Sequence, residues 1–175
     1  MLGCELYYAL NFIEELVHEY PSFEHRQAYT LFGYALYIGE CTTLQSVRGM
    51  LLTGTIKTLP DFFRQVRLPF IEHICYHTNN ATYAPAYEAL DKINKGVGTS
   101  LPKDFYICRS YLQMIRDSLG LDKIKHLKYQ PKTGGGYGIL SWTSIVTSLE
   151  QHEYSDCMAG VKRDLHMLAL DYIVY

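Results

Sequence analysis

The sequence has too few and too scattered cysteines for a fold that depends on metal or disulfide cross-links. It contains five cysteines, an odd number, and none of them forms a Cys-x-x-Cys pair. A zinc ribbon requires cysteine pairs at short spacing, and a small secreted scaffold requires an even set, so the pattern argues against both. We expect most of the thiols to be buried and unreactive. The cysteines are Cys4, Cys41, Cys75, Cys108 and Cys157.

The chain also lacks an apolar run of the roughly 20 residues that a membrane-spanning helix needs. Its first residues do not have the composition of a signal peptide, because an amphipathic pattern containing Glu5, Glu14 and Glu15 begins directly after Met1. We therefore expect no membrane partner and a reducing, cytoplasmic location.

Charge and tryptophan are scarce, whereas tyrosine is abundant. Charged residues make up 19% of the 175 residues and hydrophobic residues 48%, which excludes the composition of disordered chains. The 16 tyrosines, against one tryptophan, suit contact surfaces, because each ring can bury its face and keep its hydroxyl in water. The length predicts a single domain over residues 1–175, and any subdivision is expected at the loop 95–102, which is rich in glycine, serine and proline.

Hydrophobic residues recur at intervals of three and four over most of the chain, which predicts a mostly α-helical fold. We expect six to eight helices and one small β-hairpin near residues 123–142, where lysines are followed by a glycine-rich turn. Helix starts are marked by hydroxyl side chains, namely Thr42 or Thr43, Thr58 ahead of a proline, and Ser141 or Thr143. Other helices are expected at residues 1–20, 22–39, 82–94, 103–119 and 155–173.

The segment 42–58 has two interpretations. Apolar residues at helical spacing favour a helix, but Gly49 and Gly54 weaken it. The stretch Thr53–Thr58 is rich in β-branched residues, which favours a strand. The sequence leaves both open.

The basic residues are concentrated in the middle of the chain. Residues 1–80 contain 5 basic and 8 acidic side chains, residues 81–140 contain 9 and 5, and residues 141–175 contain 2 and 5. In the middle part, two predicted helices and a basic hairpin follow one another in the order seen in winged helix-turn-helix modules. The residues that would contact nucleic acid or an acidic protein partner are Arg109, Arg116, Lys123, Lys125, Lys128 and Lys132.

The stretch from Arg67 to His77 holds an arginine and two histidines on one predicted helix. The spacing Arg67-x5-His73 resembles the arginine–histidine motif of the HEPN ribonucleases, although Leu68 and Pro69 follow the arginine where those proteins usually have a polar residue. The resemblance implies His73 as a general acid or base and Arg67 as the group that neutralises charge on phosphorus.

A metal site is another interpretation of the same helix. His73 and His77 are four residues apart, so both imidazoles could bind a metal from one helix face. Glu15 and His18, spaced Glu-x-x-His on the first helix, would complete the ligands in the manner of di-metal helical bundles, which use two such motifs where this sequence has one. The simpler interpretation is that the histidines lie satisfied at the margin of a helical core.

The leading hypothesis is a non-enzymatic binding protein that acts through protein–protein contacts, as a small accessory, inhibitor or adaptor protein without a cofactor. Its basic middle favours an acidic partner. One alternative is a DNA- or RNA-binding module of winged-helix type that uses residues 103–132. Another is a helical ribonuclease or metal-dependent hydrolase centred on Arg67, His73 and His77. A homo-oligomer is compatible with each hypothesis.

Overall fold

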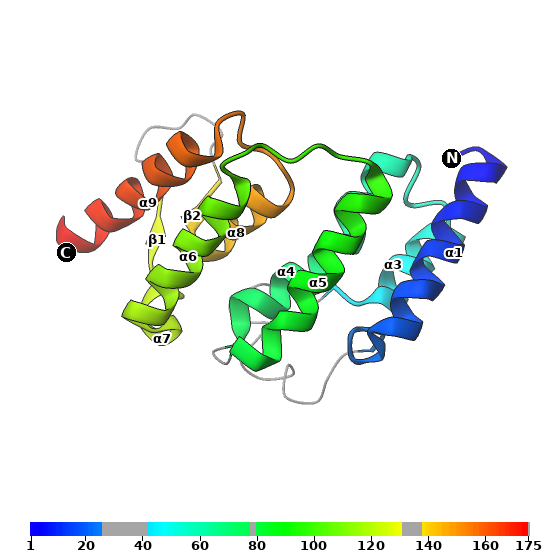
Figure 1. The fold of residues 1–175 in the computed structure, drawn as a ribbon, viewed down its shortest axis with the longest axis horizontal. Helices are drawn as coiled ribbons and strands as arrows, with labels where there is room; N and C mark the ends of the chain where they lie inside the picture. The colour runs from blue at the N-terminus through cyan, green and yellow to red at the C-terminus, as the bar shows by residue number, and fades with distance from the viewer. Residues whose placement is uncertain (26–41, 78–79, 131–137, 175) are drawn as a thin grey trace. The chain divides into compact units, whose positions relative to one another are not determined.

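The computed structural model of the chain is mostly helical (Figure 1), and hydroxyl side chains begin several of its helices. Thr43 Oγ1 accepts a 3.0 Å hydrogen bond from the Ser46 amide, and Ser141 Oγ accepts a 3.1 Å hydrogen bond from the Ser144 amide. Such caps satisfy amide donors that have no partner inside the helix, and so they fix where a helix starts. The helices capped in this way are α3 (Leu44–Leu52) after Thr43, α4 (Leu59–Tyr76) after Thr58 and α8 (Trp142–Glu150) after Ser141.

The structure describes residues 1–25, 42–77, 80–130 and 138–174. The chain divides into two compact units, Met1–Thr99 and Ser100–Tyr175, called unit 1 and unit 2 below. The division lies within the loop 95–102. The single-domain organisation stays a prediction.

Unit 1 packs its helices around aromatic side chains. The ring of Phe12 in α1 meets Phe62 and Phe63 of α4 edge-on, with ring centroids 6.3 and 5.8 Å away. Phe23 lies 4.7 Å from Phe70 by the same measure. Rings in these arrangements add to the stability that their burial already provides. The elements of unit 1 are α1 (Gly3–Glu19), the short 3-10 helix η1 (Pro21–Phe23), α3, α4 and α5 (Asn80–Val97).

Helices α1 and α5 approach closely because residue 96 has no side chain. A Cβ placed on Gly96 would lie 2.8 Å from a ring carbon of Phe12, and the hydroxyl of Tyr8 donates a 3.3 Å hydrogen bond to the Gly96 carbonyl. At the other end of this contact, Lys92 of α5 forms an ion pair with Glu19 of α1. Glycine thus sets how closely the two helices pack.

Two helices of unit 1 contain an internal proline. Pro69 lies within α4 and Pro85 within α5. A proline in a helix interior removes one backbone hydrogen bond, so it commonly kinks or ends a helix. Here α4 continues through Pro69 to Tyr76, and its packing against α5 holds it in place.

The described residues of unit 2 form four helices and one small antiparallel sheet. Its elements are α6 (Phe105–Leu119), α7 (Leu121–Ile124), β1 (Lys128–Tyr129), β2 (Leu140–Ser141), α8 and α9 (Cys157–Val174). In the sheet, Lys128 pairs with Ser141 and Tyr129 with Leu140. Gly120, with φ +81°, makes the turn between α6 and α7, a conformation that glycine adopts without strain.

The mostly helical fold with one small hairpin inside residues 123–142 is confirmed. The helix interpretation of residues 42–58 is confirmed for α3, and the strand interpretation of Thr53–Thr58 is wrong, because these residues form a turn at Gly54, with φ +71°, and an irregular segment. Most of the helix expected at 22–39 lies outside the described residues. Among the residues described, no helix combines the length and the apolar composition that crossing a membrane would require.

Candidate functional site

An apolar cleft of about 370 Å³ opens on unit 2. Volumes of this order are typical of sites that take a small ligand or the side chains of a partner. The lining residues come from four elements and one loop position and are Tyr111, Ile115 and Leu119 of α6, Ile124 of α7, Leu127, Trp142 of α8, and Lys162, Leu165, His166, Leu168 and Ala169 of α9. We call this site the unit 2 cleft.

Helical spacing explains how two helices build the walls of the unit 2 cleft. On α6, Tyr111, Ile115 and Leu119 are four residues apart and follow one side of the helix. The buried residues Cys108 and Leu112 lie on the same side of α6, so the cleft borders the core. On α9 the lining residues recur at three and four in the same way. The apolar side of each helix therefore serves both the core and the cleft.

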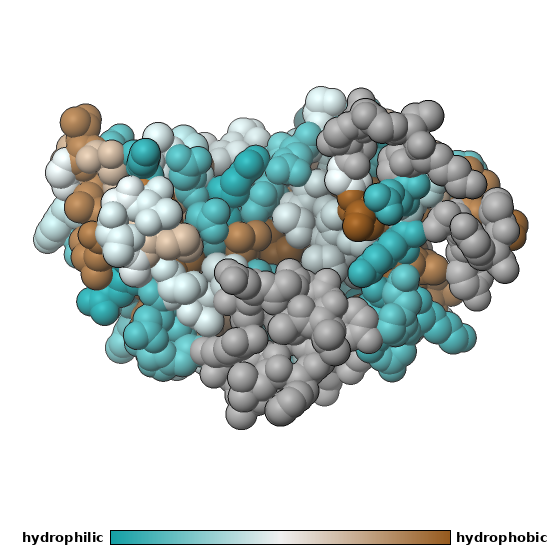
Figure 2. Space-filling model, turned by 180° about the vertical axis from the view of Figure 1, so that it is seen from behind, coloured by the Kyte–Doolittle hydropathy of each residue, from teal (hydrophilic) through white to brown (hydrophobic). Residues whose placement is uncertain are grey.

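The unit 2 cleft continues onto exposed apolar surface. Leu119, which lines the cleft, has 52% of its surface exposed. Farther along α9, Leu170 and Ile173 are also exposed, and they follow His166 at the i+4 and i+7 positions of the same helix side. Figure 2 shows one face of the molecule, on which hydrophobic residues are scattered among hydrophilic ones. Contiguous exposed apolar surface beside a cleft is typical of interaction sites.

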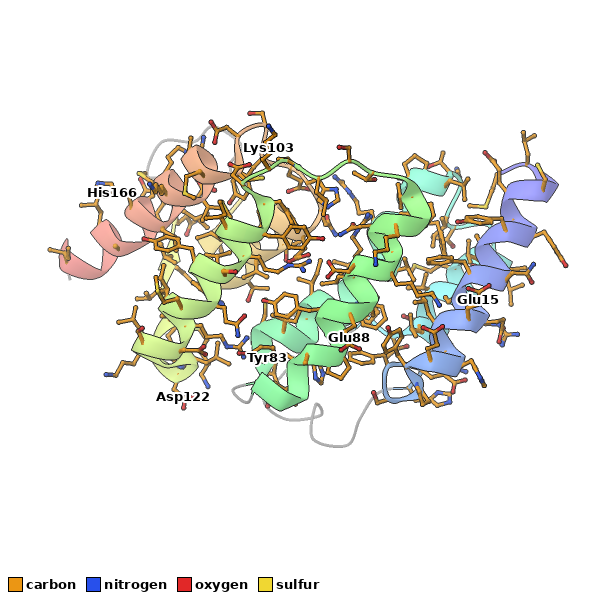
Figure 3. The ribbon with its side chains drawn as sticks, viewed as in Figure 1. Glu15, Tyr83, Glu88, Lys103, Asp122 and His166 are labelled. Atoms are coloured by element: carbon orange, nitrogen blue, oxygen red, sulfur yellow. The ribbon has the colours of Figure 1, made fainter. Side chains whose placement is uncertain are left out.

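The polar groups at the unit 2 cleft are mainly basic. Lys162 and His166 line it from α9, and both side chains are exposed. His166 is labelled in Figure 3 on the helix that forms this wall. Within the described part of the chain, neither side chain takes part in an ion pair. The Lys162 ammonium and the His166 imidazole are therefore available to a ligand.

Two further lysines lie next in the sequence to lining residues in and after α7. Lys123 and Lys128 are exposed and adjoin Ile124 and Leu127 in the sequence. Lys125 instead pairs with Asp122, 2.6 Å away, and its hydrogen bond and positive charge lower the pKa of the Asp122 carboxyl. Lys123 and Lys128 are thus exposed basic neighbours, in the sequence, of two lining residues.

The thiols of unit 2 are unsuited to nucleophilic catalysis. Cys108 and Cys157 are both buried. Burial, together with the nearby carboxylate of Asp104, raises the pKa of Cys108 to about 11 and raises the pKa of Cys157 as well. Since the thiolate is the nucleophilic form, these cysteines serve the core. Cys4 of unit 1 is exposed.

Arg109 and Arg116 of the predicted basic surface are buried in unit 2. Arg109 has 8% of its surface exposed and forms two hydrogen bonds of 2.7 Å with the Glu150 carboxylate, which has 1% exposed. The Arg109 guanidinium also lies 4.9 Å from the Phe105 ring centroid. Arg116 has 4% exposed. These two arginines therefore belong to the interior, and Glu150, the partner of Arg109, had no distinguishing signal in the sequence.

The other predicted basic residues lie at the surface or outside the described residues. Lys123 and Lys128 are exposed, Lys125 is half-buried beside Asp122, and Lys132 lies outside the described residues. The helices that a winged-helix module would combine, α5 and α6, belong to different units. Nucleic-acid binding stays a prediction, supported by exposed lysines and not by the two arginines.

Arg67 is also an interior residue, in unit 1. It has 6% of its surface exposed, and its guanidinium donates hydrogen bonds of 2.9 Å to the Phe63 carbonyl and 3.0 Å to Asn94 Oδ1. These bonds join α4 to α5. A buried guanidinium held in this way has an evident structural role.

His73 and His77 lie side by side on α4, with ring centroids 4.0 Å apart, and His73 also contacts the Phe23 ring. On α1, Glu15 lies 3.7 Å from Lys92 of α5, and His18 is exposed (Figure 3 labels Glu15). In residues 1–25, 42–77, 80–130 and 138–174, no three His, Cys, Asp or Glu side chains gather closely enough to hold a metal ion. The four predicted metal ligands are therefore not brought together.

The unit 2 cleft was not predicted from the sequence, although part of its signal is there. The apolar residues of the last helix, including Leu165, Leu168 and Ile173, are more numerous than one buried stripe needs. Only the three-dimensional structure shows that a cleft remains between these residues and α6.

Comparison with known proteins gives no match. No family model fits the chain, and no curated protein and no solved structure is detectably similar to it.

Proposed function

We propose that the protein is a non-enzymatic binding protein that acts through protein–protein contacts, and that the unit 2 cleft is its binding site. The observation that supports this function is the combination of a cleft lined mainly by aliphatic side chains with exposed apolar residues that continue along α9. Water contacts this apolar surface in the free protein, and a partner that covers it gains free energy from its burial.

The chemistry of the cleft favours binding over catalysis. Its polar groups are the Tyr111 hydroxyl, the Trp142 indole N–H, the Lys162 ammonium and the His166 imidazole, and no carboxylate or thiol is among the lining side chains. An accessory, inhibitor or adaptor role fits such a site, because aliphatic walls with few polar groups recognise shape and apolar area. A cytoplasmic location is part of this proposal.

Site-specific photo-crosslinking in cells that make the protein tests this function. A photoreactive amino acid replaces Leu119, which is exposed at the cleft, and as a matched control it replaces Leu52, which is 64% exposed on α3 of unit 1. We expect discrete protein adducts from position 119 that are absent from position 52. Adducts must also disappear when Leu165→Glu places a charge in the cleft wall.

Two outcomes would contradict the proposal. One is the absence of any protein adduct at position 119. The other is crosslinking of nucleic acid there, which would favour the DNA- or RNA-binding alternative and should then weaken when Lys123, Lys125 and Lys128 are all changed to Glu.

A further inference from the structure

We infer that the ligand of the unit 2 cleft is an amphipathic α-helix of a partner protein whose apolar side enters the cleft and whose flanking acidic residues face Lys162 and His166. This inference rests on the proposed function and specifies the partner's chemistry. It follows from three features of the cleft, which are its helical walls, its aliphatic lining and the spacing of its charges.

The walls of the cleft favour a helix over an extended peptide. Extended peptides bind by pairing their backbone with a free strand edge, and the cleft is lined by side chains of α6, α7, α8 and α9 together with Leu127. A ligand there is held by its side chains, as in helix-in-groove complexes. An amphipathic helix places several apolar side chains on one side at positions i, i+3, i+4 and i+7.

The lining favours aliphatic anchors. Proline-rich peptides bind grooves formed by aromatic rings, whereas most lining residues of this cleft are aliphatic. Ile115, Leu165 and Leu168 offer a surface against which leucine-like side chains pack closely. The exposed Leu170 and Ile173 extend this surface along α9, so that a helix of several turns has more to cover than a compact ligand would.

The charges favour an acidic partner. Lys162 and His166 are four residues apart on α9, which separates their attachment points by about 6 Å along the helix axis. Acidic residues spaced three or four apart on a facing helix have the same separation. Lys123 and Lys128, which neighbour the lining residues Ile124 and Leu127 in the sequence, add positive charge. An acidic partner is therefore attracted to the α9 wall of the cleft, and a basic one is repelled.

The only tryptophan of the chain makes the inference directly testable. Trp142 lines the cleft, so its fluorescence reports a ligand that enters. The probe is a synthetic helical peptide of about five turns, with Leu at i, i+3, i+4 and i+7 and Glu on both flanks. Its matched controls are the same peptide with every Glu changed to Lys and a scrambled peptide that is not amphipathic. We expect saturable binding of the Glu peptide and at least about tenfold weaker binding of both controls.

A charge exchange separates direct recognition from a structural effect. Both Lys162 and His166 are exposed, so the double variant Lys162→Glu, His166→Glu is expected to fold, which circular dichroism and the thermal midpoint check. In this variant the preference should invert, so that the Lys peptide binds more tightly than the Glu peptide. If these residues had only a structural role, the variant would bind the Glu peptide and the Lys peptide equally weakly. That result would overturn the inference.

The outcomes also separate this inference from the proposed function. Equal binding of the Glu, Lys and scrambled peptides, or saturation by a medium-chain fatty acid with no response to any peptide, would overturn the inference. If the photo-crosslinking at position 119 still captured a protein in a Leu165-dependent way, the proposed function would stand with a partner of different chemistry. If that crosslinking failed, the proposed function would fall first.

Discussion

The described residues of the two units differ in the side chains that join their helices. Unit 1 encloses a set of phenylalanines whose rings contact one another across α1 and α4. Unit 2 uses a buried ion pair between α6 and α8, and it leaves an apolar cleft beside α6 and α9. Their charges differ as well, since residues 1–99 carry 7 basic and 10 acidic side chains, and residues 100–175 carry 9 and 8. The proposed binding site therefore lies in the unit that contains both the buried ion pair and the apolar cleft.

The largest effect is expected from the buried ion pair of unit 2. Changing Glu150→Ala leaves the Arg109 guanidinium buried without its carboxylate, and this should lower the free energy of unfolding by about 3–5 kcal/mol. Urea denaturation followed by Trp142 fluorescence measures the loss in unit 2, and circular dichroism measures both units together.

The double variant Arg109→Leu, Glu150→Leu is the control for this change. It removes both charges, so it should recover most of the stability that Glu150→Ala loses. If the fluorescence transition shifts while part of the circular dichroism transition stays in place, the two units unfold separately. Coincident shifts of both signals would indicate one cooperative domain.

A smaller effect is expected in unit 1 at the contact between α1 and α5. The change Gly96→Ala places a methyl group against the Phe12 ring, and such overpacking should cost about 1–3 kcal/mol of unfolding free energy. Gly49→Ala is the matched control, because a Cβ at this helical position of α3 has no neighbour within 4 Å. It should raise stability by about 0.5–1 kcal/mol. Similar stability changes at both positions would show that the close approach at Gly96 is unimportant.

The smallest effect is expected at the exposed pair of Asp122 and Lys125. Because the pKa of Asp122 is lowered in the folded protein, its contribution to stability is present above the carboxyl's ordinary pKa and is lost as the pH falls through the lowered value. From a pH of about 6 to below about 3, the wild type should lose slightly more thermal stability than Asp122→Asn. A larger loss of thermal stability in Asp122→Asn than in the wild type would contradict a stabilising contribution of the Asp122 carboxylate.

Local signals allowed much of the fold to be predicted from the sequence. Thr43, Thr58 and Ser141 begin helices because a hydroxyl acts within one turn of its own position. The hairpin at 123–142 was equally accessible, since lysines and glycines mark it locally.

The candidate site was harder to predict because it depends on which side of a helix is covered. Arg109 and Arg116 resemble surface residues in the sequence, and their burial depends on packing between elements that are far apart in the chain. Glu150, the partner of Arg109, is 41 residues away. A periodic pattern shows that α9 has an apolar side but not that α6 leaves part of that side open.

The chain order of the cleft's walls has a consequence for biosynthesis. Unit 1 is continuous in sequence and leaves the ribosome before unit 2, so it can fold while synthesis proceeds. Helix α9 follows α6, α7 and Trp142 in the chain, and the cleft lacks one wall until α9 has emerged. The proposed binding site is therefore complete only after the last helix has been synthesised.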